Sequence, residues 1–182
     1  MSEYSLIILT LYFFTLCNVF IAKFVDVKIG NILAVGTALT ASGVAAFRPE
    51  YFPDMDTYEL IFEIAALGDF NNLAYWFSHG EPGFKILQYL ISLTGLGFFG
   101  FLFFMAAISI LLLLYISRLS SVPFAYLWFT YFSFAFLLRD LGVIRLGIAS
   151  HLILIFYLHR SIIWQSVAII TATLAFQYFA FV

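Results

Sequence analysis

The sequence predicts an all-α integral membrane protein, and two observations carry that prediction. Of the 182 residues, 64% are hydrophobic and only 10% are charged, and the mean hydropathy is +1.07. A soluble domain usually carries about 25% charged residues, because its surface has to face water. The apolar residues also gather in runs close to the ~20 residues with which a helix crosses a bilayer. We therefore expect a multi-spanning helical bundle, with residues 1–182 forming a single membrane domain.

Six apolar runs predict about six transmembrane helices. They cover residues 4–22, 29–47, 98–116, 122–138, 146–158 and 162–182. The second run is rich in small residues, which let helices approach closely in lipid. The fifth run needs part of the charged segment before it to reach full length. The sequence ends inside the sixth run without a polar anchor, which a natural last helix allows and which a truncated chain or fragment would also show.

A further apolar segment, residues 83–97, is too short to cross a membrane. Its 15 residues rise only about 22 Å as a helix, against a hydrocarbon core of roughly 30 Å. The segment predicts an interfacial or re-entrant helix that starts near Glu81 and Pro82. Proline suits a first helical turn, and an acid suits the positive end of a helix. The turn at residues 95–97 ends it.

Residues 48–81 form an acidic, aromatic loop outside the membrane. This loop holds seven of the ten acidic residues, together with Tyr and Trp residues typical of the membrane interface. Within it, residues 58–64 predict an amphipathic helix lying on the membrane. The basic residues divide four against four between the two faces, which leaves the positive-inside rule undecided. The acidity of the loop favours an outer location for it, for the junction at residues 139–145 and for the N-terminus.

Composition also excludes several classes of protein. The net charge is -2 without a basic stripe, which excludes a nucleic-acid-binding protein. The one cysteine, Cys17, lies in an apolar run, so the sequence predicts no disulfide framework. No spacing matches a zinc site, a P-loop or a dinucleotide fingerprint, and we expect neither a metal nor a cofactor.

The first candidate cluster lies after the second predicted helix. It consists of Asp54 and Asp56, two residues apart, with Tyr58 beside them. Such carboxylates can act as a general base or bind a sugar hydroxyl. The same residues are also typical of a solvated turn in which an Asp caps the following helix.

The second cluster is Glu81 with the Pro-Gly-Phe that follows, and Lys85 is next to it. One interpretation is an acid held near the lipid surface at the positive end of an interfacial helix. The alternative is an ordinary helix start.

The third cluster covers residues 139–149 and includes Arg139 and Arg145. A charge near the centre of a span costs about 2.5–3.5 kcal/mol, so its presence indicates a functional site. The two residues are six apart and fall on different faces of a continuous helix, but a break at Gly142 could turn both guanidinium groups toward one phosphate. Arg139 is also typical of a snorkelling interface anchor.

Taken together, the three clusters resemble the EpsG/Wzy-type polysaccharide polymerases of bacteria. The matching patterns are Asp-x-Asp-x-Tyr, Glu-Pro-Gly-Phe and Ile-Arg-x-Gly-Ile-Ala, which here begin at Asp54, Glu81 and Ile144. The resemblance covers residues 48–149 in the order and spacing of the family. Family members are longer, and where they often have Gln after the motif Arg this chain has Leu146.

This resemblance implies a glycosyltransferase of the bacterial inner membrane. It would join undecaprenyl-diphosphate-linked repeat units into O antigen, capsule or exopolysaccharide. Asp56, Asp54, Glu81 and Arg145 are then the expected catalytic residues, and Arg139, Tyr58, Arg48 and Lys85 the expected substrate-binding residues. The expected partners are the lipid-linked oligosaccharide, membrane lipid and other membrane proteins of polysaccharide assembly, without nucleic acid.

Two alternatives remain open from the sequence. The same arginines suit a transporter or flippase-like protein for an anionic glycolipid. A shortened relative could also be inactive and act as a membrane partner of the assembly machinery.

Overall fold

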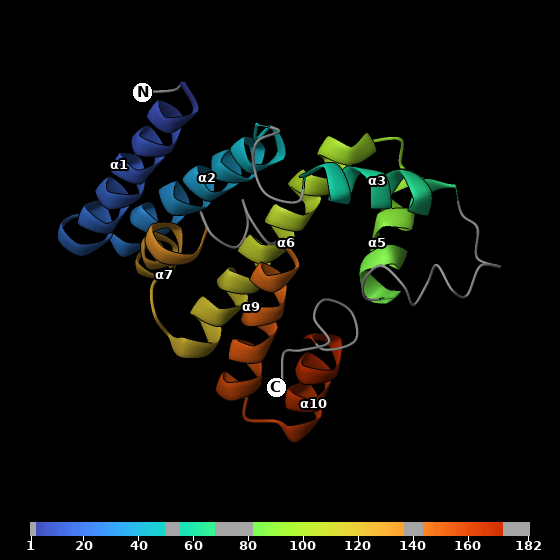
Figure 1. Cartoon of the computed structure of the whole chain (residues 1–182). Coiled ribbons are helices and arrows are strands. Elements are labelled where there is room, and N and C mark those ends of the chain that lie inside the picture. Colours follow the sequence, from blue (N-terminus) through green and yellow to red (C-terminus); the bar gives the residue numbers. More distant parts are fainter. Residues whose placement is uncertain (1–2, 50–54, 68–81, 137–143, 173–182) are drawn as a thin grey trace.

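The computed structural model describes residues 3–49, 55–67, 82–136 and 144–172. Every regular element in these ranges is a helix, as the sequence predicts. In chain order they are α1 (Glu3–Phe24), α2 (Val27–Ala46), α3 (Met55–Ala66), α5 (Pro82–Ser92), α6 (Gly97–Ser120), α7 (Phe124–Tyr131), the π-helical segment η1 (Phe132–Phe136), α9 (Ile144–Leu158) and α10 (Ile162–Thr171) (Figure 1).

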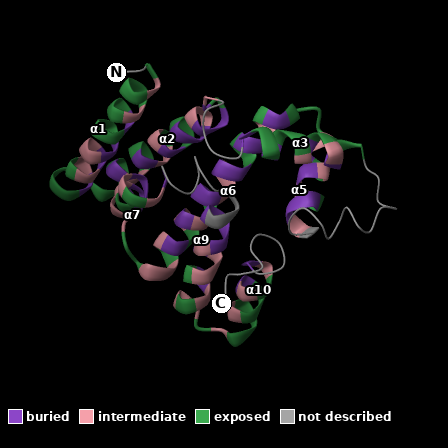
Figure 2. Cartoon of the chain, in the orientation of Figure 1, coloured by how far each residue is buried: buried purple, intermediate pink, exposed green. Residues whose placement is uncertain are grey.

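Three of these helices are long and apolar enough to cross a membrane. They are α1, α2 and α6, with 22, 20 and 24 residues. The other predicted spans are represented in the described residues by the shorter apolar helices 124–136, 147–158 and 162–171. The outer face of α1 carries Leu9 and Phe13, whose side chains are 56% and 61% exposed, and Figure 2 shows that much of this helix is exposed. Such a surface suits lipid rather than water.

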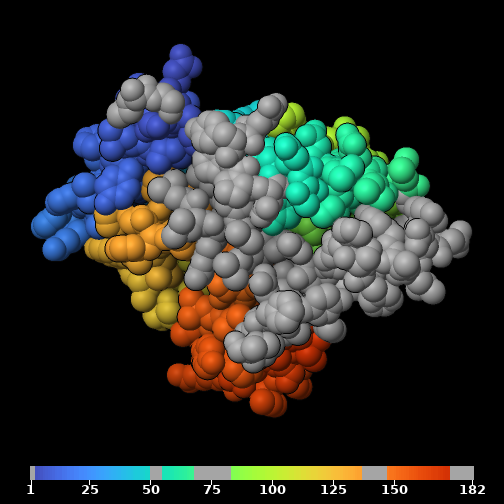
Figure 3. All heavy atoms as spheres, viewed as in Figure 1, coloured from blue at the N-terminus to red at the C-terminus, as the bar shows by residue number. Residues whose placement is uncertain are grey.

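The long helix α6 runs through the middle of the structure (Figure 1). It contacts α2, α5, α7 and α9, and α10 packs on α9. The helices α1, α2 and α7 pack against one another, and α3 and α5 pack together near the start of α6. Figure 3 shows that α3 lies at the surface of the molecule.

Hydrogen bonds between polar side chains join the N-terminal helices. Asn18 of α1 donates to Thr37 of α2 over 2.9 Å, and Asn31 of α2 accepts from the backbone N–H of Ala125 at the start of α7 over 3.0 Å. Interhelical bonds of this kind contribute about 0.6 kcal/mol each in membrane proteins. They therefore favour one register of these helices relative to one another.

The turn between α1 and α2 is fixed by an N-cap. The Asp26 carboxylate accepts from the backbone N–H groups of Lys28 and Ile29 at 2.7 and 3.0 Å. These bonds, the one from Ile29 first, lower the pKa of Asp26, because they stabilise its charged form. The cap explains why α2 begins at Val27, two residues earlier than predicted.

The close approach of α1 and α2 requires a glycine at position 30. A methyl group on Gly30 would lie 2.5 Å from the Cβ of Ala22 and 2.6 Å from its backbone. We expect Gly30→Ala to lower the free energy of unfolding by about 1–3 kcal/mol, as overpacking does. Gly36 has open space around it, so Gly36→Ala should be neutral or stabilising, because alanine favours a helix by about 1 kcal/mol over glycine. Thermal unfolding in detergent compares the two variants, and equal melting temperatures would contradict the close contact.

A second buried cluster lies apart from the main core, where α3 and α5 meet α6. It contains Ala46, Met55, Tyr58, Phe62, Phe84, Ile91, Phe98, Phe101, Leu102, Met105, Ile148 and Ala149. Its rings are in direct contact: Phe84 and Phe101 lie 5.4 Å apart between centroids, and Phe62 and Phe101 lie 5.5 Å apart. Aromatic pairs of this geometry add about 0.5–1.5 kcal/mol to the burial of their surface.

Candidate functional site

The described parts of the three sequence motifs share this second cluster. Met55 and Tyr58 belong to the first motif, Phe84 to the second, and Ile148 and Ala149 to the third. Residues far apart in the sequence are thus held together by one set of apolar contacts. Asp54, Glu81 and Arg139 lie outside the described residues. Arg145 has its backbone in the first turn of α9, and its side chain is not described.

The helix α3 is amphipathic, as predicted for this part of the loop. Its buried residues Met55, Tyr58, Phe62 and Ala65 follow the helical repeat and face the cluster. Its acidic residues Asp56, Glu59 and Glu63 are exposed. Asp56 lies in the first turn, where the positive end of a helix favours an acid.

Tyr58 takes part in the packing of the cluster. The side chain is only 2% exposed, and its ring lies 6.0 Å from that of Phe84. This contact links the first motif to the second. The substrate-binding role expected for Tyr58 stays a prediction.

The helix α5 buries its polar side chains together with Phe84 and Ile91, and it exposes other apolar side chains. Lys85 and Gln88 are fully buried, whereas Ile86 and Leu90 are 48% and 53% exposed. The Gln88 amide has no hydrogen-bond partner among the described residues. In water this arrangement would cost free energy twice, because polar groups are desolvated while apolar groups stay hydrated. It is the arrangement expected of a helix whose outer face meets lipid.

The two ends of α5 agree with the sequence prediction at its start and differ from it at its end. The helix begins at Pro82 and stops at Ser92, and the predicted turn follows it, with Gly95 and Gly97 at φ values of +75° and +66°. Glycine adopts such angles without the steric cost that a side chain brings. The helix is 11 residues long, shorter than predicted.

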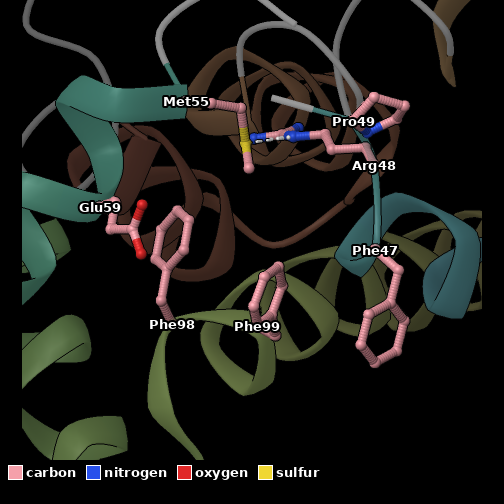
Figure 4. A pocket seen from close by; sticks show the side chains of 7 residues that line it. All are labelled: Phe47, Arg48, Pro49, Met55, Glu59, Phe98 and Phe99. Atoms are coloured by element: carbon pink, nitrogen blue, oxygen red, sulfur yellow. Dashed lines mark hydrogen bonds between the residues drawn. The ribbon is translucent and has the colours of Figure 1, made fainter. Parts of the chain in front are cut away.

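A hollow of about 680 Å³ opens beside the cluster, between the end of α2, α3 and the start of α6. It is lined by Phe47, Arg48, Pro49, Met55, Glu59, Phe98 and Phe99 (Figure 4).

One wall of this hollow holds a cation. The Arg48 side chain is 3% exposed, and its Nε–H donates to the Met55 sulfur over 2.8 Å (Figure 4). This bond ties the segment after α2 to the first residue of α3. Among the expected substrate-binding residues that the structure describes, Arg48 is the one that lines the hollow.

The hollow also contains a carboxylate that sequence reasoning missed. Glu59 lines it from α3, while Asp56, three residues earlier, is not among its lining residues. The spacing of Glu59 from Met55, one helical turn, was the available signal. This spacing did not single out Glu59 in the sequence, because the same loop contains seven acidic residues.

The family of the chain follows from its similarity to known proteins. A model of the EpsG family matches residues 31–182. The chain belongs to the EpsG family. The match includes all three motifs, so the resemblance inferred from them is confirmed. Neither a curated protein nor a solved structure matches the chain.

Family and fold together define a polysaccharide-polymerase-like membrane protein. The EpsG family connects the chain with polysaccharide biosynthesis, and its apolar helices connect it with a membrane. The hollow opens where α2 ends and α6 begins, so it lies at the ends of two candidate spans. A site at that level can receive a ligand whose lipid tail stays in the bilayer.

Proposed function

We propose that this EpsG-family chain is a glycosyltransferase that polymerises lipid-linked saccharides at the outer face of the bacterial inner membrane. Its substrates are undecaprenyl-diphosphate-linked repeat units, and its products are O antigen, capsule or exopolysaccharide. Membership of the EpsG family carries this proposal. The shared cluster of the three motifs supports it, because one reaction needs them close together.

The reaction requires a cation for the leaving group and a base for the acceptor. An acceptor hydroxyl oxygen attacks the anomeric carbon of the donor, the bond from that carbon to the phosphate oxygen breaks, and the hydroxyl proton passes to a carboxylate. Asp56 is our first candidate for the base, followed by Asp54 and then Glu81. Arg145 and Arg139 would stabilise the departing diphosphate. The backbone N–H groups in the first turn of α9, where Arg145 stands, favour an anion as well.

In the membrane we place six spans and one re-entrant helix. The buried Lys85 and Gln88 and the exposed apolar residues of α5 support its insertion. Its 11 residues cover only about 16 Å, too little to cross. The amphipathic α3 then lies on the outer surface, with its acids toward water. Lys85, inside α5, would reach the substrate from the membrane side.

This topology predicts that the acidic loop and the 139–145 junction lie on the same face. In a Cys17→Ser background, we expect Asn71→Cys and Gly142→Cys both to react with an impermeant thiol reagent in intact spheroplasts. If α5 crosses the membrane, one of the two sites will be labelled without the other. Labelling of both after lysis shows that each cysteine is accessible.

Complementation tests the function itself. We expect the gene to restore a ladder of polysaccharide lengths on a gel in a strain that lacks its polymerase. An assay with lipid-linked donor and acceptor then distinguishes polymerisation from transport, because transport forms no glycosidic bond. Restored export of single repeat units without longer chains would favour a transporter. Binding to the assembly proteins without either activity would favour an inactive partner.

A further inference from the structure

A second hollow, the α10 groove, lies between α6, α9 and α10 and has a volume of about 350 Å³. This volume falls within the roughly 300–1,000 Å³ typical of small-molecule sites. One face of α10 lines the groove with residues at the spacing of the helical repeat: Trp164, Val167, Ala168 and Thr171. The other lining residues come from α6, α9 and the turn after α9: Leu112, Tyr115, Leu152, Ile155 and His159. Because most of these side chains are apolar, the groove suits a hydrocarbon chain.

Aromatic and polar rings gather at one end of the α10 groove. The His159 ring contacts those of Tyr115 and Trp164, with centroids 6.5 and 6.2 Å apart. Its Nδ1 accepts from the backbone N–H of Ser161 over 3.1 Å, which leaves Nε2–H to donate to a ligand. Figure 1 shows the turn between α9 and α10 at the opposite end of the molecule from α3. Tyr and Trp are enriched where lipid meets water, so these rings indicate the level of the lipid headgroups.

Two arginines lie at the same end of these helices. Arg160 directly follows His159, and Arg118 lies three residues after Tyr115 in the last turn of α6. Both side chains are exposed, and within the described ranges neither forms an ion pair. After Glu81 the sequence contains a single acid, which precedes α9, whereas Arg160 follows that helix. The two positive charges therefore have no acidic neighbour along α6, α9 or α10.

We propose that the α10 groove binds one acyl chain of an anionic phospholipid, whose phosphate lies at Arg118 and Arg160. Basic pockets between membrane helices bind anionic headgroups in this way. A free phosphate would leave the apolar groove empty, and a neutral lipid would gain little from the arginines. From Trp164 to Thr171 the groove follows α10 for about 10 Å, within the roughly 15 Å of one leaflet. The groove therefore fits a tail of one leaflet; its placement in the cytoplasmic leaflet rests on the proposed topology, whereas the binding does not.

Quenching of Trp164 by brominated lipid tests this proposal on the full chain in phosphatidylcholine vesicles. The chain carries Trp76→Phe, and Trp128 is fully buried, so a brominated acyl chain reaches Trp164, which is 58% exposed. The quantity measured is the binding constant of brominated phosphatidylglycerol relative to that of brominated phosphatidylcholine. We expect a ratio of at least about five, because each arginine near an anionic lipid contributes a factor of about five. A ratio near one would overturn the proposal.

The matched control moves the reporter to another basic helix end. It combines Phe20→Trp with Trp164→Phe and Trp76→Phe. Phe20 is 54% exposed on α1, three residues before Lys23, and it does not line the α10 groove. It therefore reports the general attraction of anionic lipid to basic residues. We expect a ratio near one there, and equal ratios at the two positions would remove the assignment to the groove.

Substitutions then separate the charges from the groove. Arg118→Gln and Arg160→Gln should each lower the ratio about fivefold, whereas Lys28→Gln, exposed in the first turn of α2, removes the same charge and should leave it unchanged. Val167→Phe fills the groove from a site that is 47% exposed and should reduce quenching by phosphatidylglycerol. Ile163→Phe, 70% exposed and outside the lining, should not. Equal effects of a variant and its control would contradict the proposed site.

Competition distinguishes the phospholipid from other sources of phosphate. Unbrominated phosphatidylglycerol should restore the fluorescence of Trp164, and inorganic phosphate should not. Undecaprenyl phosphate at the same mole fraction should displace the brominated lipid less well than phosphatidylglycerol does. Displacement by inorganic phosphate would indicate a site for free anions, and stronger displacement by undecaprenyl phosphate would indicate a site for the polyprenyl tail; either result overturns the proposal. None of these measurements requires polymerisation, so the lipid site and the proposed function succeed or fail separately.

Discussion

Replacing Arg145 with alanine is expected to reduce polymer formation about 100-fold or more in an active, full-length context. The leaving diphosphate carries the charge that develops in the transition state, and removing one group that stabilises such a charge typically costs 10²–10³ in kcat. Arg145 stands in the first turn of α9, three residues before Ile148, which packs in the cluster shared by the three motifs. Its loss should therefore exceed or equal that of Arg139→Ala. A ladder gel and the rate with isolated lipid-linked substrate measure both variants.

Two comparisons separate this role from stability. Arg145→Lys should also be poor, because a lysine keeps the charge but cannot make the bidentate contact with a phosphate. Arg118→Ala is the matched control, since Arg118 is exposed in the last turn of α6. Normal ladders from Arg145→Ala, at normal protein levels, would remove the assignment of this residue to the leaving group.

Long helices were predictable because bilayer thickness sets their length. The runs at residues 4–22, 29–47 and 98–116 correspond to α1, α2 and α6 with ends that differ by one to four residues. The differences arise from single groups: Asp26 caps α2 at an earlier position, and Ser121 ends α6 in a left-handed conformation with φ of +58°. Hydropathy does not report such local bonds.

The run at 122–138 was harder to predict in detail. Its described part is α-helical to Tyr131 and then π-helical over η1. Packing of aromatic side chains accompanies this change, because Trp128 lies 5.7 Å from Phe136 and 5.5 Å from Phe132 between ring centroids. Hydrophobic residues predict a helix in lipid, but the choice between hydrogen-bond patterns depends on tertiary contacts. The sequence therefore predicts the helix but not the change from α-helical to π-helical hydrogen bonding within it.

Site residues that belong to sequence motifs could be predicted. Residues that only the fold brings together from separate segments could not. Asp56 was expected at the start of a surface helix, and it lies in the first turn of α3. Glu59 was missed, because the hollow that it lines is completed by Arg48 and by Phe99, which is 40 residues further along the chain. One of seven carboxylates can be assigned to a site only when the residues that other helices place beside it are known.

The Asp54 and Asp56 pair offers the second large expected effect. We expect Asp56→Asn to abolish polymerisation and Asp54→Asn to reduce it. An amide cannot take the proton of the acceptor hydroxyl, and a positioned base contributes about 10²–10⁴-fold. Asp56 is exposed on α3, so its substitution removes no buried contact, and expression should stay normal. Binding of the lipid-linked donor should also persist, which a pull-down with that lipid measures.

The interpretation of the same pair as a helix cap makes a different prediction. Asparagine caps a helix about as well as aspartate, so a capping role would leave Asp54→Asn fully active. Loss of a base at Asp56 should lower kcat in an active preparation and leave the KM for the acceptor little changed. Glu63→Gln, on the same exposed face, should affect neither value. If both Asn variants still polymerise and Glu81→Gln does not, the base is Glu81, and the aspartates serve only the turn before α3.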